Sequence, residues 1–207
     1  QGNGGTLNGG TWQDGTMYYE IVPNSALELA LWLEADRMGF MLPTVTYDAF
    51  QNQQNVVQNE KRQNYDNQPY GQTSYIVGKL LYPEGHPYNW TTIGSLEDLQ
   101  NATLKDVHDF YNKWYGPNNA TLVVAGDFDV DQAKEWIEKY FGEIKSSEQV
   151  AALKTQHVKL DNWKRASYQD NFAQSPELTM LFPTVEQFTN DSYALDILAD
   201  LIGRGKK

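Results

Sequence analysis

The sequence predicts an α+β fold in which an antiparallel sheet is backed by helices. Two short runs rich in threonine, tyrosine and tryptophan come first, and segments with the apolar spacing of helices follow them. Strands and helices then alternate without any internal repeat. Hydrophobic residues make up 40% and aromatic residues 13% of the 207 residues, which is enough to build a core and excludes global disorder.

The N-terminal segment is predicted to form a β-hairpin over residues 6–22. Thr, Tyr and Trp residues favour strands here, and the sequence Gln-Asp-Gly at residues 13–15 favours the turn between them. The second strand ends at Pro23, which has no backbone N–H to donate to a sheet.

Helices are predicted to follow the hairpin. Asn24 and Ser25 are candidate N-caps of the first helix, and its run of leucine, alanine and tryptophan leaves almost no polar face. We therefore expect this helix to be buried on most sides. Thr46 is placed to cap the second helix, which ends before Pro69. These helices are predicted over residues 24–38, 47–64 and 73–81.

The second half of the chain predicts further helices and two more strands. Ser95 and Thr103 are placed to cap helices, and either Asp129 or Asp131 begins an amphipathic helix. The run Thr-Leu-Val-Val is typical of a buried strand. The predicted strands cover residues 120–125 and 178–182, and the predicted helices cover residues 103–114, 129–141 and 191–202.

We predict a division of the chain into two units, at residues 1–150 and 151–207. Between Lys145 and Arg165 the pattern weakens into mixed polar sequence, which predicts a linker or an edge strand. The chain opens at Gln1 without an initiator methionine and stops directly after a helical pattern. We therefore expect a fragment of a longer protein, truncated at both ends.

The charge and composition exclude several classes of protein. With 27 acidic and 16 basic side chains the formal net charge is −11, which argues against nucleic acid as a partner. Apolar runs are far shorter than the roughly 20 residues of a membrane span, so none is predicted. The chain has no cysteine, so it has neither disulfides nor thiolate metal ligands. The acidic, asparagine-rich composition is compatible with a bacterial periplasmic or cell-envelope protein.

Candidate metal ligands are few. His86, His108 and His157 are widely separated, and no His-Glu-x-x-His motif occurs in either order. Glu60 is more informative, because on the predicted helix it lies one turn beyond Val56 and shares an apolar face. A partly buried carboxylate there needs an arginine, a proton or a metal ion as partner. The alternative is an exposed glutamate at a helix end.

Several short stretches occur in an order found in one enzyme family. They are Leu7–Thr11, Asp14–Thr16, Tyr18–Pro23, Leu31–Gly39, Val56–Gln63, Asp66–Gly71, His86–Tyr88, Ile93–Asp98 and Tyr115–Phe128. Together they cover most of the chain and resemble the pitrilysin/insulinase-like zinc peptidases, the M16-type family with an inverted His-x-x-Glu-His motif. The resemblance implies half of a LuxS/mitochondrial processing peptidase-like metallohydrolase fold, with residues 1–150 lacking its metal helix and residues 151–207 beginning a second α/β unit.

The resemblance also implies a zinc-dependent endopeptidase in the intact protein. Its two zinc-binding histidines and its general base belong to the motif upstream of this chain, so no catalytic residue is expected within it. The third zinc ligand, the glutamate after Val-Val, corresponds to Glu60. With the motif helix absent, we expect the fragment alone to be inactive.

A substrate-binding strand is implied at Leu7, Asn8, Gly9 and Gly10, which match the strand that pairs with an extended substrate in the family. The glycines would let a peptide backbone approach closely. The implied partners are a peptide or small protein substrate and a second homologous half of the peptidase. Tyr18, Tyr19 and Trp32 are assigned to core packing.

Two alternatives stay open. A non-catalytic homologous subunit, or a peptide-binding partner of such a peptidase, would keep the fold and lose the metal motif. A stand-alone domain could instead bind extended peptides through the Asn8 edge without metal. Retention of Glu60 favours the catalytic half, because a degenerate half has no chemical need for it.

Overall fold

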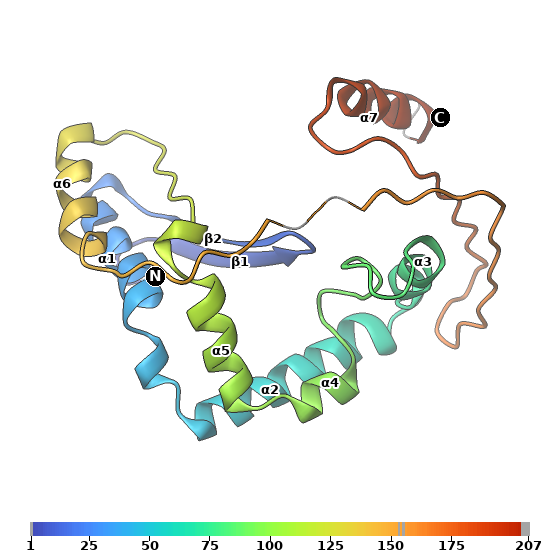
Figure 1. Cartoon of the computed structure of the whole chain (residues 1–207), viewed down its shortest axis with the longest axis horizontal. Coiled ribbons are helices and arrows are strands. Elements are labelled where there is room, and N and C mark those ends of the chain that lie inside the picture. The colour runs from blue at the N-terminus through green and yellow to red at the C-terminus, as the bar shows by residue number, and fades with distance from the viewer. Residues whose placement is uncertain (1, 153, 155, 204–207) are drawn as a thin grey trace.

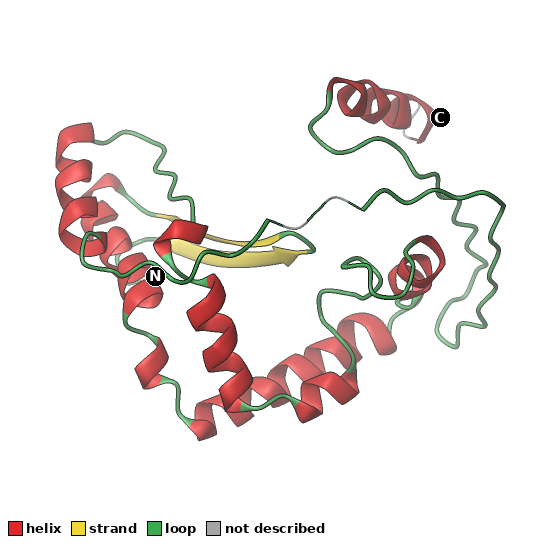
Figure 2. Cartoon of the chain, viewed as in Figure 1, coloured by secondary structure: helices red, strands yellow, loops and turns green. Residues whose placement is uncertain are grey.

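The computed structural model describes residues 2–152, 154 and 156–203. Residues 153, 155 and 204–207 of the predicted second unit lie outside the described part of the chain. Helices lie at one end of the antiparallel hairpin and below it in this view, and the chain then crosses the molecule toward α3 and ends in α7 (Figures 1 and 2). Antiparallel strands accompanied by helices confirm the α+β class.

The hairpin consists of β1 (Thr6–Trp12) and β2 (Gly15–Ile21) and confirms the prediction. Trp12 pairs with Gly15, so the loop between the strands has two residues, Gln13 and Asp14. Within the described residues the sheet contains these two strands alone. Both strands are largely exposed, so the hairpin depends on its contacts with the rest of the chain for stability.

Helix α1 (Leu27–Gly39) is less buried than its sequence predicts. It follows a short 3₁₀ turn, and neither predicted N-cap side chain bonds its first turn. Leu31 and Ala35 are its buried residues, whereas Trp32 is 44% exposed. The expectation of burial on most sides is therefore wrong, because α1 packs on one side against α6 (Val130–Phe141).

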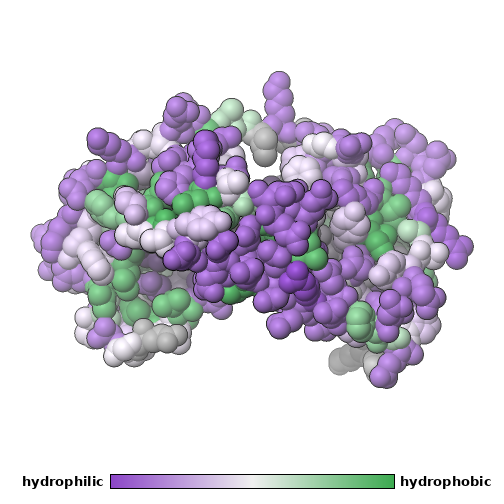
Figure 3. All heavy atoms as spheres, turned by 90° about the horizontal axis from the view of Figure 1, so that it is seen from below, coloured by the Kyte–Doolittle hydropathy of each residue, from purple (hydrophilic) through white to green (hydrophobic). Residues whose placement is uncertain are grey.

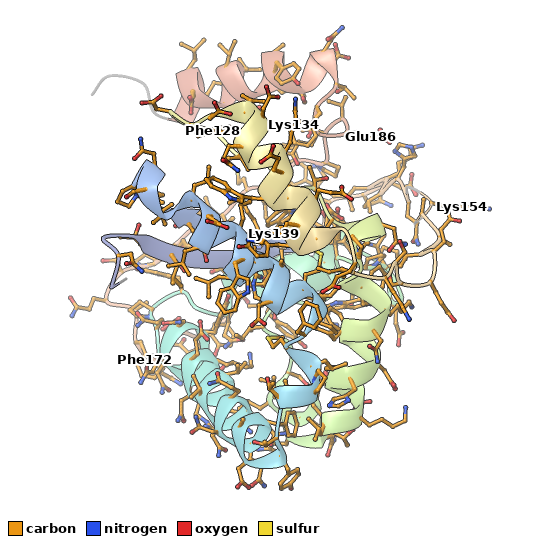
Figure 4. The ribbon with its side chains drawn as sticks, turned by 90° about the vertical axis from the view of Figure 1, so that its left-hand side faces the viewer. Phe128, Lys134, Lys139, Lys154, Phe172 and Glu186 are labelled. Carbon is orange, nitrogen blue, oxygen red and sulfur yellow. The ribbon has the colours of Figure 1, made fainter. Side chains whose placement is uncertain are left out.

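The contact between α1 and α6 includes a polar cluster. Lys139 and the Tyr140 hydroxyl both donate hydrogen bonds to Glu28 Oε1, at 3.1 and 2.7 Å. Figure 4 shows Lys139 on α6 directed toward α1. The hydrogen bonds from Tyr140 and Lys139 lower the pKa of Glu28.

Helix α2 (Tyr47–Lys61) begins and ends close to where the sequence predicts. The Thr46 side chain accepts a hydrogen bond from the Ala49 N–H at 3.2 Å and caps the helix. The helix continues as a π-helical turn and leads to α3. The following elements are the π turn Arg62–Asp66, α3 (Thr73–Leu81) and α4 (Leu96–Asn101), with short 3₁₀ turns at Leu42–Thr44 and Pro117–Asn119.

The remaining predicted caps are confirmed. Ser95 caps α4 through the Asp98 N–H, and Asp129, rather than Asp131, caps α6 through Gln132. Helix α5 (Leu104–Trp114) begins with a complete capping box between Thr103 and Asp106.

We expect the Asp106 cap to stabilise the protein in a pH-dependent way. The hydroxyl and N–H of Thr103 lower the pKa of Asp106, so its stabilising effect is present above the unfolded-state pKa, about 3.9, and is lost as pH falls through the folded-state pKa. Urea unfolding should show Asp106→Asn destabilised at pH 7, with the difference shrinking toward pH 2. Asp109→Asn is the control, because Asp109 pairs with Lys105 instead of capping. A difference that does not change with pH would contradict this account.

Both later strand predictions are wrong. Residues 120–125 and 178–182 form no sheet among the described residues, and Val123 and Leu178 are 78% and 85% exposed. A strand needs a hydrogen-bonded neighbour, and neither segment has one in the described part of the chain. The described residues between 145 and 165 also hold no strand, so this stretch is a connection.

The last helix, α7 (Asn190–Gly203), is found where residues 191–202 predict one, and none of its residues is buried. The division into units at residue 150 stays a prediction. In the described part of the chain, no helix combines the length and apolar character that crossing a bilayer requires.

Candidate functional site

Glu60 lies in the last turn of α2, and its side chain is exposed. Among the described residues, no hydrogen bond or ion pair engages its carboxylate. Val56, one turn earlier, is 48% exposed. The expectation that the Glu60 carboxylate would be partly buried is therefore wrong, although Val57 and Phe50 on the same face are half-buried.

The face of α2 that packs is a polar one. The Gln54 side chain donates hydrogen bonds to the carbonyls of Leu99 at 2.6 Å and Ala102 at 3.2 Å, at the end of α4. Gln58 is buried, with an exposed fraction of 8%, and accepts a hydrogen bond from Arg62. Because Gln54 satisfies carbonyls at the end of α4 from this face, Glu60 lies on a side of α2 that is turned away from α4.

The histidines do not complete a metal site with Glu60. His86 is 5% exposed and packs between Tyr82 and Tyr88, where its Nδ1 accepts the Tyr88 N–H at 3.0 Å. His157 is exposed and lies 3.5 Å from Glu186. The residues that the structure describes contain no group of three ligands able to hold a metal ion. Glu60 thus fits one position in a metal site, while the described residues alone do not form one.

The free edge of β1 is the second candidate feature. A two-residue hairpin closes on a hydrogen-bonded pair, so by alternation the N–H and C=O groups of Leu7, Gly9 and Thr11 face away from β2. The Gly9 N–H agrees with this pattern, since it donates to Asn8 Oδ1 at 2.8 Å. The predicted substrate residues therefore lie on an exposed strand whose outer edge is open among the described residues.

The free edge of β1 lies beside an apolar cleft on one side and open space at Gly10. A cleft of about 50 Å³ lies between β1 and α1, lined by apolar residues that include Leu7, Leu29 and Leu33. A side chain at Gly10 would meet no atom within 4 Å. Figure 3 shows apolar residues reaching the surface at both ends of the molecule with a polar band between them.

An aromatic cluster on the hairpin is absent from the sequence prediction. The Tyr18 hydroxyl hydrogen-bonds that of Tyr115 at 2.7 Å, and the Arg37 guanidinium lies 3.5 Å from the Tyr18 ring centroid. Burial, followed by the Tyr18 bond, raises the pKa of Tyr115. Tyr18 and Tyr19 are each 43% exposed, so their assignment to core packing is wrong, as is that of Trp32.

A second contact holds the hairpin turn. The Tyr88 hydroxyl donates to Asp14 Oδ2, and this bond raises the pKa of Tyr88 to about 12. Asp14 and Tyr88 are 74 residues apart, so no local pattern in the sequence indicates their contact. It links the turn to the loop that contains His86.

The sequence profile of the family described as "Peptidase M16 inactive domain" matches residues 101–207, just over half of the chain. The chain belongs to the M16 peptidase family. The zinc protease PqqE of Helicobacter pylori is 32% identical over 206 residues, which are 98% of this M16 chain and 46% of that protein. An insulin-degrading enzyme homolog of Dictyostelium discoideum is 30% identical over 142 residues, covering 67% of this chain and 14% of the homolog.

A solved structure supports the same relationship. The crystal structure of a protease from Helicobacter pylori superposes with a TM-score of 0.68 and 31% identity, over 76% of this chain and 38% of that one. The chain therefore spans about half the length of PqqE and a smaller share of the other two relatives. The predicted family and its metallohydrolase fold are confirmed, and the relatives' names support zinc as the metal of the family.

Proposed function

We propose that this chain supplies one zinc ligand, Glu60, and a substrate-pairing strand, β1, to an M16 zinc metalloendopeptidase. The observation that carries the proposal is the exposed Glu60 carboxylate, which forms no hydrogen bond or ion pair with any described residue. The opposite face of its helix is packed. A carboxylate in this position is available to a metal held from outside the described residues.

Zinc in such a site supplies an activated water for peptide hydrolysis. The two histidine ligands and the general base are expected in residues outside this chain, so the 207-residue chain alone is inactive. The role of Glu60 is to complete the ligand set. Packing of α2 on α4 through Gln54 holds the helix that carries it.

The role of β1 is to bind an extended peptide as an added strand. Leu7, Gly9 and Thr11 point their N–H and C=O groups outward at every second residue, which is the spacing that an added strand needs for its hydrogen bonds. The Gly9 N–H is bonded to Asn8, so the peptide must displace the Asn8 side chain to reach it. Backbone pairing of this kind accepts many sequences, which suits a peptidase acting on peptides or small proteins.

Partners and location follow from the same proposal. A second homologous half would close the substrate-binding chamber, and the exposed apolar residues of the described chain are compatible with such contacts. The acidic, cysteine-free composition supports a periplasmic or cell-envelope location in a bacterium.

A non-catalytic subunit is the second candidate function. It is favoured by one observation, namely that the matching family profile is described as an inactive domain. That profile begins at residue 101 and does not include Glu60. Peptide hydrolysis therefore distinguishes the two candidates.

The test uses the protein expressed from the complete coding region. We expect it to hydrolyse an extended fluorogenic peptide, to lose activity with a zinc chelator and to regain it with added zinc. Binding of the same peptide without hydrolysis, whether or not zinc is added, would replace the peptidase proposal with the non-catalytic one.

We expect Leu7→Pro in that protein to weaken substrate binding selectively. Proline removes an outward N–H of β1 while leaving the hydrogen-bonded pairs with β2 in place. KM should rise roughly tenfold, which is the effect expected from one lost hydrogen bond together with steric crowding, and kcat should change little. Leu7→Val, which keeps the N–H, is the matched control. Equal KM values for both variants would exclude β1 as the substrate-pairing edge.

A further inference from the structure

The segment 164–177 lies along α3 and the connection that precedes it. At one end, Lys164 Nζ donates to the carbonyl of Leu80 at 2.7 Å, in the last turn of α3. At the other end, Thr73 Oγ1 lies 3.4 Å from Glu177 Oε1 at the start of α3. Figure 1 shows the corresponding orange and brown chain beside α3. The segment 164–177 therefore spans the length of α3.

Asp170 accepts three hydrogen bonds, two within this segment and one from Tyr70. Its Oδ1 accepts the N–H groups of Phe172 at 2.7 Å and Ala173 at 2.8 Å, which closes a local turn. Its Oδ2 accepts the Tyr70 N–H at 2.9 Å, from a residue 100 positions away. These three backbone donors lower the pKa of Asp170, so the carboxylate is the form that holds the contact.

Tyr70 is held from both of its ends. Besides the bond from its N–H to Asp170, its hydroxyl donates to the carbonyl of Ser175 at 2.7 Å. Its backbone has a positive φ of 61°, a conformation that costs free energy in a residue with a side chain. A strained residue persists where its surroundings hold its conformation, and here the bonds to Asp170 and Ser175 act together with the local bond from the Thr73 N–H to the Tyr70 carbonyl.

A short series of contacts leads from Tyr70 to the end of α2. Gln72 Nε2 donates to Asp66 Oδ1 at 3.2 Å, and Lys61 Nζ lies 3.7 Å from the same oxygen. Lys61 directly follows Glu60 in the last turn of α2. The Asp66 carboxylate therefore connects the Tyr70 loop to the turn that carries the candidate zinc ligand.

We infer that Asp170 is a positioning residue, which fastens the segment 164–177 to Tyr70 and thereby fixes the end of α2 that carries Glu60. The Asp170 contact joins the predicted second unit to the first across 100 residues of sequence. Its consequence for metal binding rests on the proposed function. The coupling between Asp170 and the end of α2 is a property of the described chain and can be measured without zinc. Failure of this inference can therefore be distinguished from failure of the proposed function.

The test is amide hydrogen exchange of the 207-residue chain, followed by two-dimensional NMR for the unchanged chain and Asp170→Asn. Asparagine keeps the shape but loses the charge and turns an N–H₂ group toward one of the backbone donors. We expect the amides of Tyr70, Phe172 and Ala173 to exchange roughly tenfold faster, and those of residues 62–66 to accelerate by about threefold. Asp161→Asn is the matched control, because Asp161 contacts Lys159 and lies in the same part of the chain.

Two outcomes would overturn the inference. Faster exchange confined to residues 170–173 would reduce Asp170 to a local turn residue, and unchanged exchange of Tyr70 would exclude the contact altogether. Should Asp170→Asn fail to fold, Tyr70→Phe removes the bond to Ser175 alone. That variant should also accelerate exchange in residues 62–66, and unchanged exchange there would contradict the coupling.

Discussion

Replacing Glu60 by glutamine in the protein expressed from its complete coding region will remove both bound zinc and peptidase activity. A neutral amide is a far weaker zinc ligand than a carboxylate, and loss of second-shell groups alone weakens metal binding by about 10- to 100-fold. We therefore expect zinc affinity to fall by at least about 100-fold. Zinc content by elemental analysis and hydrolysis of a fluorogenic peptide measure the two effects.

The control for this change lies on the same helix. Asp48 occupies the first turn of α2, and no hydrogen bond or ion pair engages it among the described residues. Asp48→Asn removes one carboxylate from α2 and should leave zinc content and activity unchanged. A Glu60→Gln protein that keeps a full equivalent of zinc would show that Glu60 is not a ligand.

Gly71→Ala should be among the most destabilising single substitutions in the chain. A Cβ at residue 71 would lie 1.9 Å from the carbonyl oxygen of Tyr65, which is backbone and cannot move aside alone. The α2–α3 connection must shift to accept it, and we expect a loss of about 3–4 kcal/mol in the free energy of unfolding. Urea unfolding followed by circular dichroism measures this loss.

Gly10→Ala is the matched control for Gly71→Ala. A Cβ at residue 10 meets nothing within 4 Å, so the change in stability should stay within about 0.5 kcal/mol. Equal stabilities of the two variants would mean that the chain does not approach itself closely at Gly71.

Local signals in the sequence predict much of this fold. Thr46, Ser95, Thr103 and Asp129 cap helices as expected, because a cap depends on residues three positions apart. The turn at Gln13 and Asp14 likewise follows from local preference. These elements need no information from distant parts of the chain.

Predictions of structure that depends on contacts between residues far apart in the sequence succeed less often. The apolar run at residues 120–125 predicts a strand, but strand formation requires a neighbour that the described residues do not supply. The composition of α1 predicts a buried helix, but burial depends on what packs against it, and Trp32 is 44% exposed. The contacts of Asp170 with Tyr70 and of Asp14 with Tyr88 join residues far apart in the sequence and have no local signal.

In the candidate site, too, local features can be predicted from the sequence and burial cannot. The apolar spacing around Glu60 predicts a partly buried carboxylate, and the structure shows the Glu60 side chain exposed. Its assignment as a ligand rests on that exposed carboxylate, which no described residue engages, together with the Val-Val-Gln-Asn-Glu stretch that resembles the M16 family, to which the chain belongs. The sequence predicts the hairpin that carries Leu7–Gly10, but only the register shows that Leu7 and Gly9 face the open edge, whereas Asn8 and Gly10 pair with β2.

The most direct test of the central claim is to read the coding region upstream of Gln1, in frame. The account predicts a His-x-x-Glu-His motif several dozen residues before Glu60, because one carboxylate cannot hold zinc without the two histidines. Replacement of those histidines by residues that cannot bind zinc would contradict the claim and leave the non-catalytic subunit in its place.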